Sequence, residues 1–465
     1  MPLPAEPGSY RDREGRVFYR DGRVFRALSA RALAAWEEVS ATAFFRRAQE
    51  AGEVVATRRV ELPSDAPAPT AHAWAGALEH ERVPFVSYPY EWSFGMLRAA
   101  ALLQLRLLDA ALAEGFVLKD SSAYNVQWVG TRPVFIDVPS FQRLATNEPW
   151  VGYLQFCQLF LYPLLMTAYL DLPFQPWLRG SLDGVTPAVA ASLFHGRQRF
   201  RRGVLAHVYL QAKLQAVAGG ARKSLKRELA ETGFGRELIV ANVRRLIRLI
   251  ESLEWKRTRS EWVSYRETHG YDAADQAAKR RFVAAAAAAA PRRQIWDLGA
   301  NTGEYSRVCR DAAETVVALD ADPLAIERLY RELRREDDRR ILPLVGNLVD
   351  PSPAQGWRGA ERHAWIERGR PDLILALALL HHLVIGANVP LDELVDWLAD
   401  LGGDLVIELV AKDDPMVAKL LLEKEDRYQD YGRERLESAL AQRYTISDRL
   451  ELASGTRTLY FARRR

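Results

Sequence analysis

Residues Asp297 to Gly303, DLGANTG, place an acidic side chain and two glycines directly after an apolar run. Glycine allows a tight turn and lets a ligand approach the main chain closely. The next apolar run ends at Asp320, 21 positions after Gly299. An acid at the tip of a second strand can accept hydrogen bonds from both hydroxyls of a ribose. This spacing predicts a site for a cofactor that contains a nucleoside.

The turn lacks the G-x-G-x-x-G spacing that brings the positive end of a helix onto a pyrophosphate. A cofactor without phosphates does not need that arrangement. S-adenosylmethionine (SAM) is such a cofactor, since it carries adenine, ribose, a sulfonium and an amino acid tail. Its methyl group leaves by in-line displacement at the sulfonium carbon. An enzyme therefore mainly has to align the nucleophile with the methyl group and exclude water.

Two histidines, His381 and His382, follow the fourth predicted strand of this half, where ligands meet such sheets. Free imidazole titrates near about 6.5, so one of them could accept a proton from the nucleophile. The alternative is structural, with one ring bracing the loop and the other packing. Glu408, at the end of the fifth predicted strand, is a second candidate for orienting the substrate. Residues 412–414, Lys-Asp-Asp, follow on a predicted substrate-side loop.

The elements that must position these residues alternate between strands and helices from about residue 275. RQIWDLG, TVVALDA, ILPLVGNL, PDLILALALL and DLVIEL are typical of strands, with helical segments between them. This alternation predicts βαβ units and a mostly parallel sheet covered on both faces. YTISDRLEL and RTLYFARR predict a terminal pair of strands, and KRRFVAAAAAAAP predicts a helix before the first strand.

In order and spacing, IWDLGANTGEYS, VVALDADPLAIERL, LPLVGNLVD, PDLILALALLHHL and GGDLVIELV resemble the successive motifs of class I SAM-dependent methyltransferases. The resemblance covers roughly residues 270–465. It implies an α/β Rossmann-like domain with a mostly parallel seven-stranded sheet, SAM as the cofactor, and methyltransferase activity. HHL and IELVAKDDPMV also look like segments of methyltransferases associated with nodulation in rhizobia, a likeness that brings no substrate with it.

The resemblance also implies a cofactor-binding set. For the methionine end it implies Asp297 and the backbone of Gly299, Asn301 and Gly303. For the ribose it implies Asp320, with Asp322 just past the strand end. Asn347 with Leu348 occupies the position that contacts adenine, although many family members carry Asp there. The alternatives are that Asp297 only braces the turn and that Asp320 is a solvated loop acid. No metal is expected in this domain.

A second constellation lies in FVLKDSSAYNVQWVGTRPVFIDV, where Asp120, Asn125 and Asp137 are spaced by five and twelve positions. In phosphoryl transfer one Asp orients the attacking hydroxyl, while an Asn and a second Asp hold Mg²⁺ on the phosphates. The pattern resembles the catalytic and metal-binding loops of protein-kinase-like phosphotransferases. It implies an α+β kinase-like domain with a helical lobe, and ATP and Mg²⁺ as possible ligands.

This half departs from the kinase pattern. No glycine-rich loop precedes residue 60, and no lysine stands clearly on a third strand. Arg26 is the nearest substitute, with Glu37 or Glu38 as its helix partner. Leu118 stands where His is usual, and the third loop reads D-V-P rather than D-F-G. Three alternatives stay open: an active kinase, a degenerate kinase-like fold that binds or scaffolds, and coincidence in an unrelated α+β domain.

We divide the chain into a kinase-like domain at residues 1–264 and a methyltransferase domain at 265–465. The first comprises a small β-containing lobe at about 1–92 and a helical lobe at about 93–264. In its small lobe, GRVFYRDGRVFRAL predicts a hairpin, and the segment opened by Ser29 predicts one helix. Tyr265, His269 and Tyr271 precede the second domain and could form a lid.

The composition limits the partners. A net charge of +4 argues against nucleic acid, and two cysteines in 465 residues fit a reducing cytoplasm without a disulfide framework. The longest apolar run, from Tyr153, is interrupted by Gln155, Gln158 and Pro163, which predicts a buried helix rather than a membrane span. We therefore expect no membrane partner. RQRFRRG and RKSLKREL are either solvated helix faces or a docking surface for an acidic partner or polyanion.

We expect a cytoplasmic SAM-dependent methyltransferase (EC 2.1.1.-) with an unidentified O or N acceptor and a kinase-like domain that binds or modifies the substrate. The first alternative is an ATP-dependent phosphotransferase with a SAM-sensing Rossmann-like domain, and the second is a non-catalytic adaptor. The intact turn with Asp320 argues against the adaptor, and the missing lysine argues against the phosphotransferase. The sequence identifies neither the acceptor nor the oligomeric state.

Overall fold

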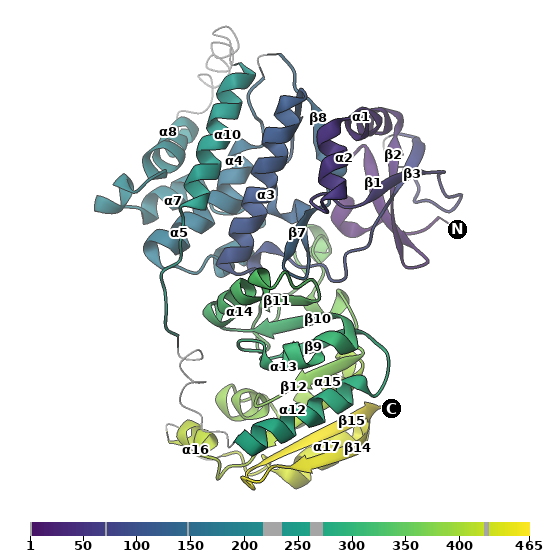
Figure 1. Cartoon of the computed structure of the whole chain (residues 1–465), viewed down its shortest axis with the longest axis vertical. Coiled ribbons are helices and arrows are strands. Elements are labelled where there is room, and N and C mark those ends of the chain that lie inside the picture. Colours follow the sequence, from purple (N-terminus) through teal and green to yellow (C-terminus); the bar gives the residue numbers. More distant parts are fainter. Residues whose placement is uncertain (1, 70–71, 147, 217–234, 261–272, 423–426) are drawn as a thin grey trace. The chain divides into compact units, whose positions relative to one another are not determined.

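The computed structural model describes residues 2–69, 72–146, 148–216, 235–260, 273–422 and 427–465 (Figure 1). The chain forms two units. The first unit comprises Met1–Trp128, Pro133–Arg257 and Ala354–His363, and the second comprises Val129–Arg132, Thr258–Pro353 and Ala364–Arg465. Each unit thus contains one short segment that is remote in sequence from the rest of it. The predicted boundary near 265 lies outside the described residues and stays a prediction.

A four-stranded antiparallel sheet begins the first unit, in the order β1-β2-β4-β3. Its strands are β1 (Gly15–Arg20), β2 (Arg23–Ser29), β3 (Thr57–Val60) and β4 (Trp74–His80). The predicted hairpin is confirmed, because Asp21 and Gly22 both adopt positive φ angles, 51° and 74°, between β1 and β2. Two left-handed residues give the turn whose twist matches that of the flanking strands.

The helix predicted from Ser29 is in fact two helices, α1 (Ala30–Ser40) and α2 (Ala43–Glu50). Ser29 caps α1 as predicted, and its hydroxyl accepts a hydrogen bond from the Ala32 amide at 3.2 Å. Thr42 caps the second helix in the same way, through the Phe45 amide at 3.4 Å. A side-chain cap satisfies amides that lack an intrahelical partner, so Thr42 starts a new helix instead of continuing the old one.

The helical part of the first unit begins with α3 (Phe94–Ala113), which ends before Gly115 as predicted, with φ of 82° at that glycine. Short strands follow: β5 (Phe116–Leu118), β6 (Val126–Val129), β7 (Arg132–Phe135) and β8 (Phe141–Arg143). Between residues 150 and 260 all regular elements in the described ranges are helical, as predicted: α4 (Tyr153–Phe156), α5 (Tyr162–Leu170), α6 (Gln175–Gly180), α7 (Pro187–Leu193), α8 (Leu210–Ala216) and α10 (Arg236–Glu251), with π-helical turns at Cys157–Leu161 and Leu205–Tyr209.

The apolar run from Tyr153 is a buried helical segment, as predicted, with Phe160, Leu164 and Leu165 fully buried. Among the described helices none has the length and apolar character needed to cross a membrane.

The second unit is built on one seven-stranded sheet in the order β11-β10-β9-β12-β13-β15-β14. Its strands are β9 (Arg292–Leu298), β10 (Ala313–Asp320), β11 (Ile341–Val345), β12 (Leu373–Ala376), β13 (Asp404–Val410), β14 (Tyr444–Glu451) and β15 (Arg457–Arg464). The first five are parallel, and β15 runs antiparallel to both β13 and β14. The mostly parallel seven-stranded sheet and the terminal pair of strands are therefore confirmed.

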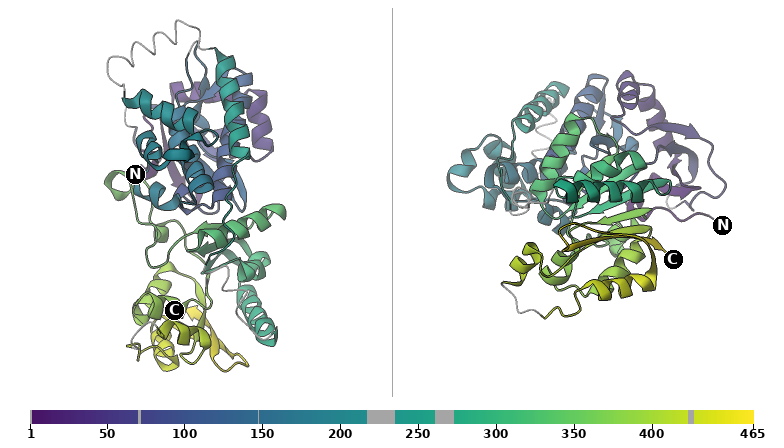
Figure 2. Two further views of the ribbon diagram at one scale, coloured as in Figure 1. Left: turned by 90° about the vertical axis from the view of Figure 1, so that its left-hand side faces the viewer. Right: turned by 60° about the horizontal axis from the view of Figure 1, so that its bottom comes forward.

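Helices cover both faces of this sheet (Figures 1 and 2). They are α12 (Ala273–Ala288), α13 (Glu304–Cys309), α14 (Pro323–Arg335), α15 (Leu391–Leu401), α16 (Pro415–Leu421) and α17 (Arg433–Arg443). Ile295 and Leu375 belong to a core that also contains Phe282 of α12 and Leu329 of α14. Alternate strand residues point to opposite faces, so Leu298 and Ile407 face α15 instead. Each helix layer thus buries one face of the sheet.

The strand order places a switch point between β9 and β12. The chain leaves β9 for β10 on one side, and returns to β12 on the other side. Leu298 is in register with Leu319 on one neighbour and with Ala376 on the other, so the three strands end at one level. In open α/β sheets ligands bind outside the carboxyl ends of the strands at such a point.

Leu329→Ala should lower the free energy of unfolding by about 2–5 kcal/mol, because the side chain is fully buried in the α14 layer and its loss leaves a cavity. Leu422→Ala is the matched control, since Leu422 is 84% exposed, and should change stability by less than about 0.5 kcal/mol. Urea unfolding followed by circular dichroism measures both. Equal losses in the two variants would contradict the described packing.

Candidate functional site

The turn after β9 is held in left-handed conformations. The φ angles of Gly299, Asn301 and Gly303 are 76°, 50° and 76°. The amides of Gly299 and Ala300 donate to the Leu319 carbonyl at 2.8 and 2.9 Å, which ties the turn to the end of β10. A Cβ at Gly303 would lie 2.5 Å from a Leu329 methyl carbon. Gly303 therefore serves the close packing of the turn on α14.

Asp320 bridges the turn and the start of α14. One carboxylate oxygen accepts the Asn301 amide at 2.8 Å, and the other accepts the Asp322 amide at 2.8 Å. Burial, which outweighs these bonds, raises the pKa of Asp320 to about 6. Each carboxylate oxygen has two lone-pair positions. Asp320 can therefore hold the turn and still accept a hydrogen bond on each oxygen from a ligand diol.

Asp297 is almost fully buried under the turn and accepts the Ser306 hydroxyl at 2.5 Å. Burial raises its pKa to about 6, the Ser306 bond acts against that rise, and the charge of Asp320 adds to it. Because Ser306 lies on α13, this hydrogen bond of Asp297 fixes α13 to β9. Asp297 thus supports the turn from the interior of the unit.

Asp322 caps α14, since it accepts the Leu324 amide at 2.8 Å, and it also accepts the Ser260 hydroxyl. Asn347 is exposed after β11, and its side chain accepts the Val349 amide at 3.0 Å. Next to it, Leu348 turns into an apolar pocket. The two residues expected near adenine therefore differ in environment, one polar and exposed, the other apolar and half-buried.

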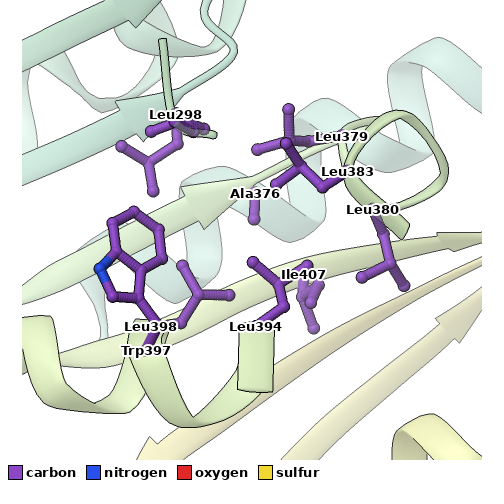
Figure 3. Close-up of a pocket in the computed structure, with 10 residues that line it drawn as sticks. Leu298, Ala376, Leu379, Leu380, Leu383, Leu394, Trp397, Leu398 and Ile407 are labelled. Carbon is purple, nitrogen blue, oxygen red and sulfur yellow. The ribbon is translucent and has the colours of Figure 1, made fainter. Parts of the chain in front are cut away.

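This pocket lies at the α15 face of the sheet (Figure 3). Its lining comes from the end of β9, the segment after β12, the inner side of α15 and β13. The residues are Leu298, Leu348, Ala376, Leu379, Leu380, Leu383, Leu394, Trp397, Leu398 and Ile407. Most of these side chains are buried, so the pocket is a small apolar void between the sheet and α15 and is not the size of a ligand.

His381 and His382 lie with ring centroids 4.0 Å apart. His381 is fully buried, whereas His382 is partly exposed and begins a π-helical turn, His382–Gly386. π-helical turns are frequent at functional sites. Of the two rings, His382 is the one with solvent access, which an acid or base that exchanges protons needs.

Glu408 is fully buried at the end of β13. One of its oxygens accepts the Lys279 ammonium at 2.6 Å and the Ala378 amide at 2.8 Å. Ala378 follows β12 and has a φ of 49°, a strained value for a residue with a Cβ. The carboxylate thus holds the turn that precedes His381, and a direct contact of Glu408 with a substrate stays a prediction.

Lys279, Ser306 and Arg457 also belong to this site and were not predicted from the sequence. Lys279, on α12, is 129 positions from Glu408 and lies 4.7 Å from the Tyr305 ring centroid. Arg457, on β15, binds Asp414 at 2.8 Å and lies 3.6 Å from Glu408. The tertiary fold brings Lys279 and Arg457 to Glu408, so no local signal could have revealed these two, whereas Ser306 lies only nine positions after Asp297.

The segment 412–414 is only partly at the surface. Asp413 is exposed, whereas Asp414 is buried, caps α16 through the Met416 amide at 3.0 Å and pairs with Arg457. The possible lid residues Tyr265, His269 and Tyr271 lie outside the described residues. In the described ranges no group of three or more His, Cys, Asp or Glu side chains is arranged to hold a metal ion.

In the first unit, Asp120, Asn125 and Asp137 converge. Burial, followed by the charge of Asp137, raises the pKa of Asp120 above its usual range, while Asn125 acts against this shift. Arg26, on β2, binds Asp137 at 2.7 Å. The predicted pairing of Arg26 with Glu37 or Glu38 is wrong.

The two glutamates have other partners, because α1 turns them to the surface: Glu37 pairs with Arg59, and Glu38 binds Arg143 at 2.7 Å. The segment Ala354–His363 also contributes to this unit. Its Arg362 guanidinium lies 4.2 Å from the ring centroid of Tyr124, directly before Asn125. The loop from Asp120 to Asn125 is thus packed on its aromatic side.

Fold and site together define an α/β protein whose second unit presents a turn suited to a nucleoside at the switch point of its sheet. Nodulation protein NoeA of Rhizobium meliloti (strain 1021) is 35% identical over 460 residues, which cover 97% of this chain and 94% of that protein. The chain therefore belongs to the NoeA family of nodulation proteins. No model of a known protein family matches it.

Parts of the chain are also similar to solved structures. They include the N-methyltransferase NodS from Bradyrhizobium japonicum WM9 in complex with S-adenosyl-L-homocysteine, at 14% identity, over 43% of this chain and 96% of that chain, with a TM-score of 0.33. Magnesium protoporphyrin IX methyltransferase (ChlM) from Synechocystis PCC 6803 matches at 12% identity, over 44% and 93%, with a TM-score of 0.31. At such TM-scores the fold rests on the strand order and register described above.

Stability should depend on pH through Asp297 and Asp320. Both carboxyls have a pKa of about 6 in the folded chain, against about 3.9 when unfolded. A raised pKa stabilises the protein fully below about pH 4, and this stabilisation is lost as the pH rises through about 6. The free energy of unfolding of Asp320→Asn, relative to that of the wild type, should thus rise by on the order of 2 kcal/mol between pH 4 and pH 7.

Urea unfolding of both proteins at the two pH values measures this difference. Asp448→Asn, at an exposed position of β14, serves as the control and should not change with pH in the same way. A difference between wild type and Asp320→Asn that stays constant with pH would refute the raised pKa.

Proposed function

We propose that the second unit is a SAM-dependent methyltransferase that transfers a methyl group to an O or N acceptor. The observation that carries the proposal is the bridge of Asp320 from the Asn301 amide to the Asp322 amide. It leaves lone pairs on both oxygens beside a turn of left-handed residues at the switch point. A ribose diol fits these two acceptors, and the family resemblance of the motifs makes SAM the nucleoside cofactor.

The residues present fit this cofactor in polarity. Asp320 would accept the ribose hydroxyls, with Asp322 fixing the helix beside it. The main chain at Gly299, Asn301 and Gly303 would lie against the methionine end. Leu348, half-buried after β11, would lie against the adenine ring, which needs little charge around it. Asp297 would not contact the cofactor directly. It would hold the turn in place through its hydrogen bond with Ser306 on α13.

When bound, SAM supplies an activated methyl group. The chain would align the acceptor and exclude water, and would accept a proton where the nucleophile carries one. We propose His382 for this base rather than His381, since His381 is fully buried. Glu408 would position the loop that carries His382 through the Ala378 amide. The acceptor itself stays unidentified, and the first unit would bind or modify it.

Calorimetric titration with SAM tests the proposal. Wild type should bind SAM, and Asp320→Ala should weaken binding on the order of 100-fold or more, because two hydrogen bonds to a charged group are lost. Asp448→Ala, in the same unit, should bind like wild type. Asp320→Asn, which keeps the shape of the side chain, should fall between them.

A cooperative thermal unfolding transition above the assay temperature in every variant would exclude simple misfolding. Transfer of labelled methyl from SAM to cell metabolites should be lost in Asp320→Ala and kept in Asp448→Ala. Absence of SAM binding by the wild type, or unchanged binding by Asp320→Ala, would end the proposal.

A second candidate is an ATP-dependent phosphotransferase in the first unit, with the second unit as a SAM sensor. The convergence of Asp120, Asn125 and Asp137 favours it. The ion pair between Arg26 and Asp137 weighs against it. A carboxylate that already neutralises a guanidinium is a poor ligand for Mg²⁺, so the metal would have to displace Arg26.

Titration with ATP and Mg²⁺ decides this candidate. If the second candidate is correct, ATP should bind the wild type and Asp320→Ala. ATP binding should be lost in Asp137→Ala. Arg26→Gln should then strengthen Mg²⁺-dependent binding several-fold, because it frees the Asp137 carboxylate. Without ATP binding in any of these proteins, Asp137 is a structural partner of Arg26 and the second candidate fails.

A further inference from the structure

Residues 196–216 of the first unit form a surface strip with an unusual composition. The strip contains four arginines and one lysine, and no Asp or Glu. It runs through a helical turn at Gly196–Phe200, the π-helical turn Leu205–Tyr209 and α8. All five basic side chains are exposed: Arg197, Arg199, Arg201, Arg202 and Lys213. We call residues 196–216 the basic–apolar strip.

The strip also exposes large apolar side chains. Phe200 is 64% exposed, Leu205 49%, Leu210 53% and Leu214 42%. Val204 and Val208 of the same strip are fully buried and anchor it to the unit. The four outer side chains are therefore additional to those that the core needs. Exposed apolar groups that gather on one segment mark an interaction site more often than scattered ones do.

Among the described residues, the basic side chains of the strip have no acidic partner. In the described part of the chain none of the five forms an ion pair with an acidic side chain, whereas Arg435 and Arg449 elsewhere do. Arg199 and Arg201 instead lie over the rings of Phe200 and Tyr169, at 4.7 and 5.4 Å. Their guanidinium groups keep hydrogen-bond donors available for an anion.

Helix α10 places a further positive charge close to the strip. Arg245 of α10 is exposed, and its charge helps lower the pKa of His207, after burial, to about 4. His207 lies inside the strip and receives a contact from the Tyr153 hydroxyl at 2.6 Å. It is therefore neutral near pH 7, and the binding charge of the strip comes from arginine and lysine, which do not titrate in that range.

We propose that the basic–apolar strip docks on an anionic phospholipid surface. Arginine and lysine side chains bind the headgroup phosphates, while Phe200 and the three exposed leucines enter the boundary of the acyl chains. Segments that combine these two features lie in the plane of the membrane interface. Such docking requires no membrane-spanning segment. The sequence argued against a membrane partner only because its longest apolar run is not a membrane span, and that argument does not apply to docking at the surface.

The apolar side chains favour lipid over other polyanions. Proteins that bind single-stranded nucleic acid place aromatic rings for the bases to stack on. Of the four exposed apolar side chains of the strip, only Phe200 offers such a ring, whereas Leu205, Leu210 and Leu214 match the acyl boundary. An acidic protein would likewise satisfy the arginines, but lipid provides both charge and an apolar phase at one surface.

Sedimentation of the full chain with vesicles tests the proposal. Phosphatidylcholine vesicles that contain phosphatidylserine should bind the chain at least ten-fold more strongly than pure phosphatidylcholine vesicles. Added salt should weaken this binding. Arg199→Gln with Arg201→Gln should reduce binding more than ten-fold, since each basic residue contributes about five-fold. Phe200→Ser with Leu205→Ser should reduce it several-fold at unchanged charge.

Arg435→Gln with Arg449→Gln removes the same charge from exposed positions of the second unit and is the matched control. This control should bind vesicles like wild type. Four results would overturn the proposal: no binding, equal binding to both vesicle types, an equal loss in the control, or full binding by Phe200→Ser/Leu205→Ser. The last, together with equally tight binding to single-stranded RNA, would assign the strip to nucleic acid instead.

Discussion

The candidate site of the second unit depends on the hydrogen bonds that the Asp320 carboxylate accepts. It accepts two main-chain amides, one from the turn after β9 and one from the start of α14. Those bonds connect the loop after β9, at the switch point, to the loop after β10. The cost is a partly desolvated charge, which shows in a pKa of about 6. A ligand diol would add donors to the same oxygens and so stabilise the charged form.

A second buried carboxylate fixes the other side of the switch point. Glu408 binds the Ala378 amide and thereby maintains a left-handed residue in the turn after β12. Its charge is balanced by Lys279 at 2.6 Å and Arg457 at 3.6 Å. Removing one member of such a buried group leaves an uncompensated charge. The two loops that meet at the switch point are therefore both held by main-chain bonds to acids.

The first unit shows how the same residue types can be used differently. Asp137 is neutralised by Arg26, and Tyr124 is covered by Arg362, so the cluster around Asp120 is closely packed. The basic–apolar strip of the same unit has the opposite character, with charges that lack acidic partners in the described ranges. Membership of the NoeA family, at 35% identity over 97% of the chain, extends across both units.

The sequence by itself determined the alternation of strands and helices, the tight turn after β9 and the position of Asp320, because these follow from local periodicity and glycine spacing. It also indicated the hairpin at Asp21 and Gly22. The Thr42 break between α1 and α2 and the partner of Arg26 were not read correctly. Only the tertiary structure decided which charges meet, since Lys279, Glu408 and Arg457 come together through the order of strands and not through their spacing. Exposure was likewise decided in three dimensions: Val204 and Leu205 are adjacent apolar residues, and packing buries the first and leaves 49% of the second exposed.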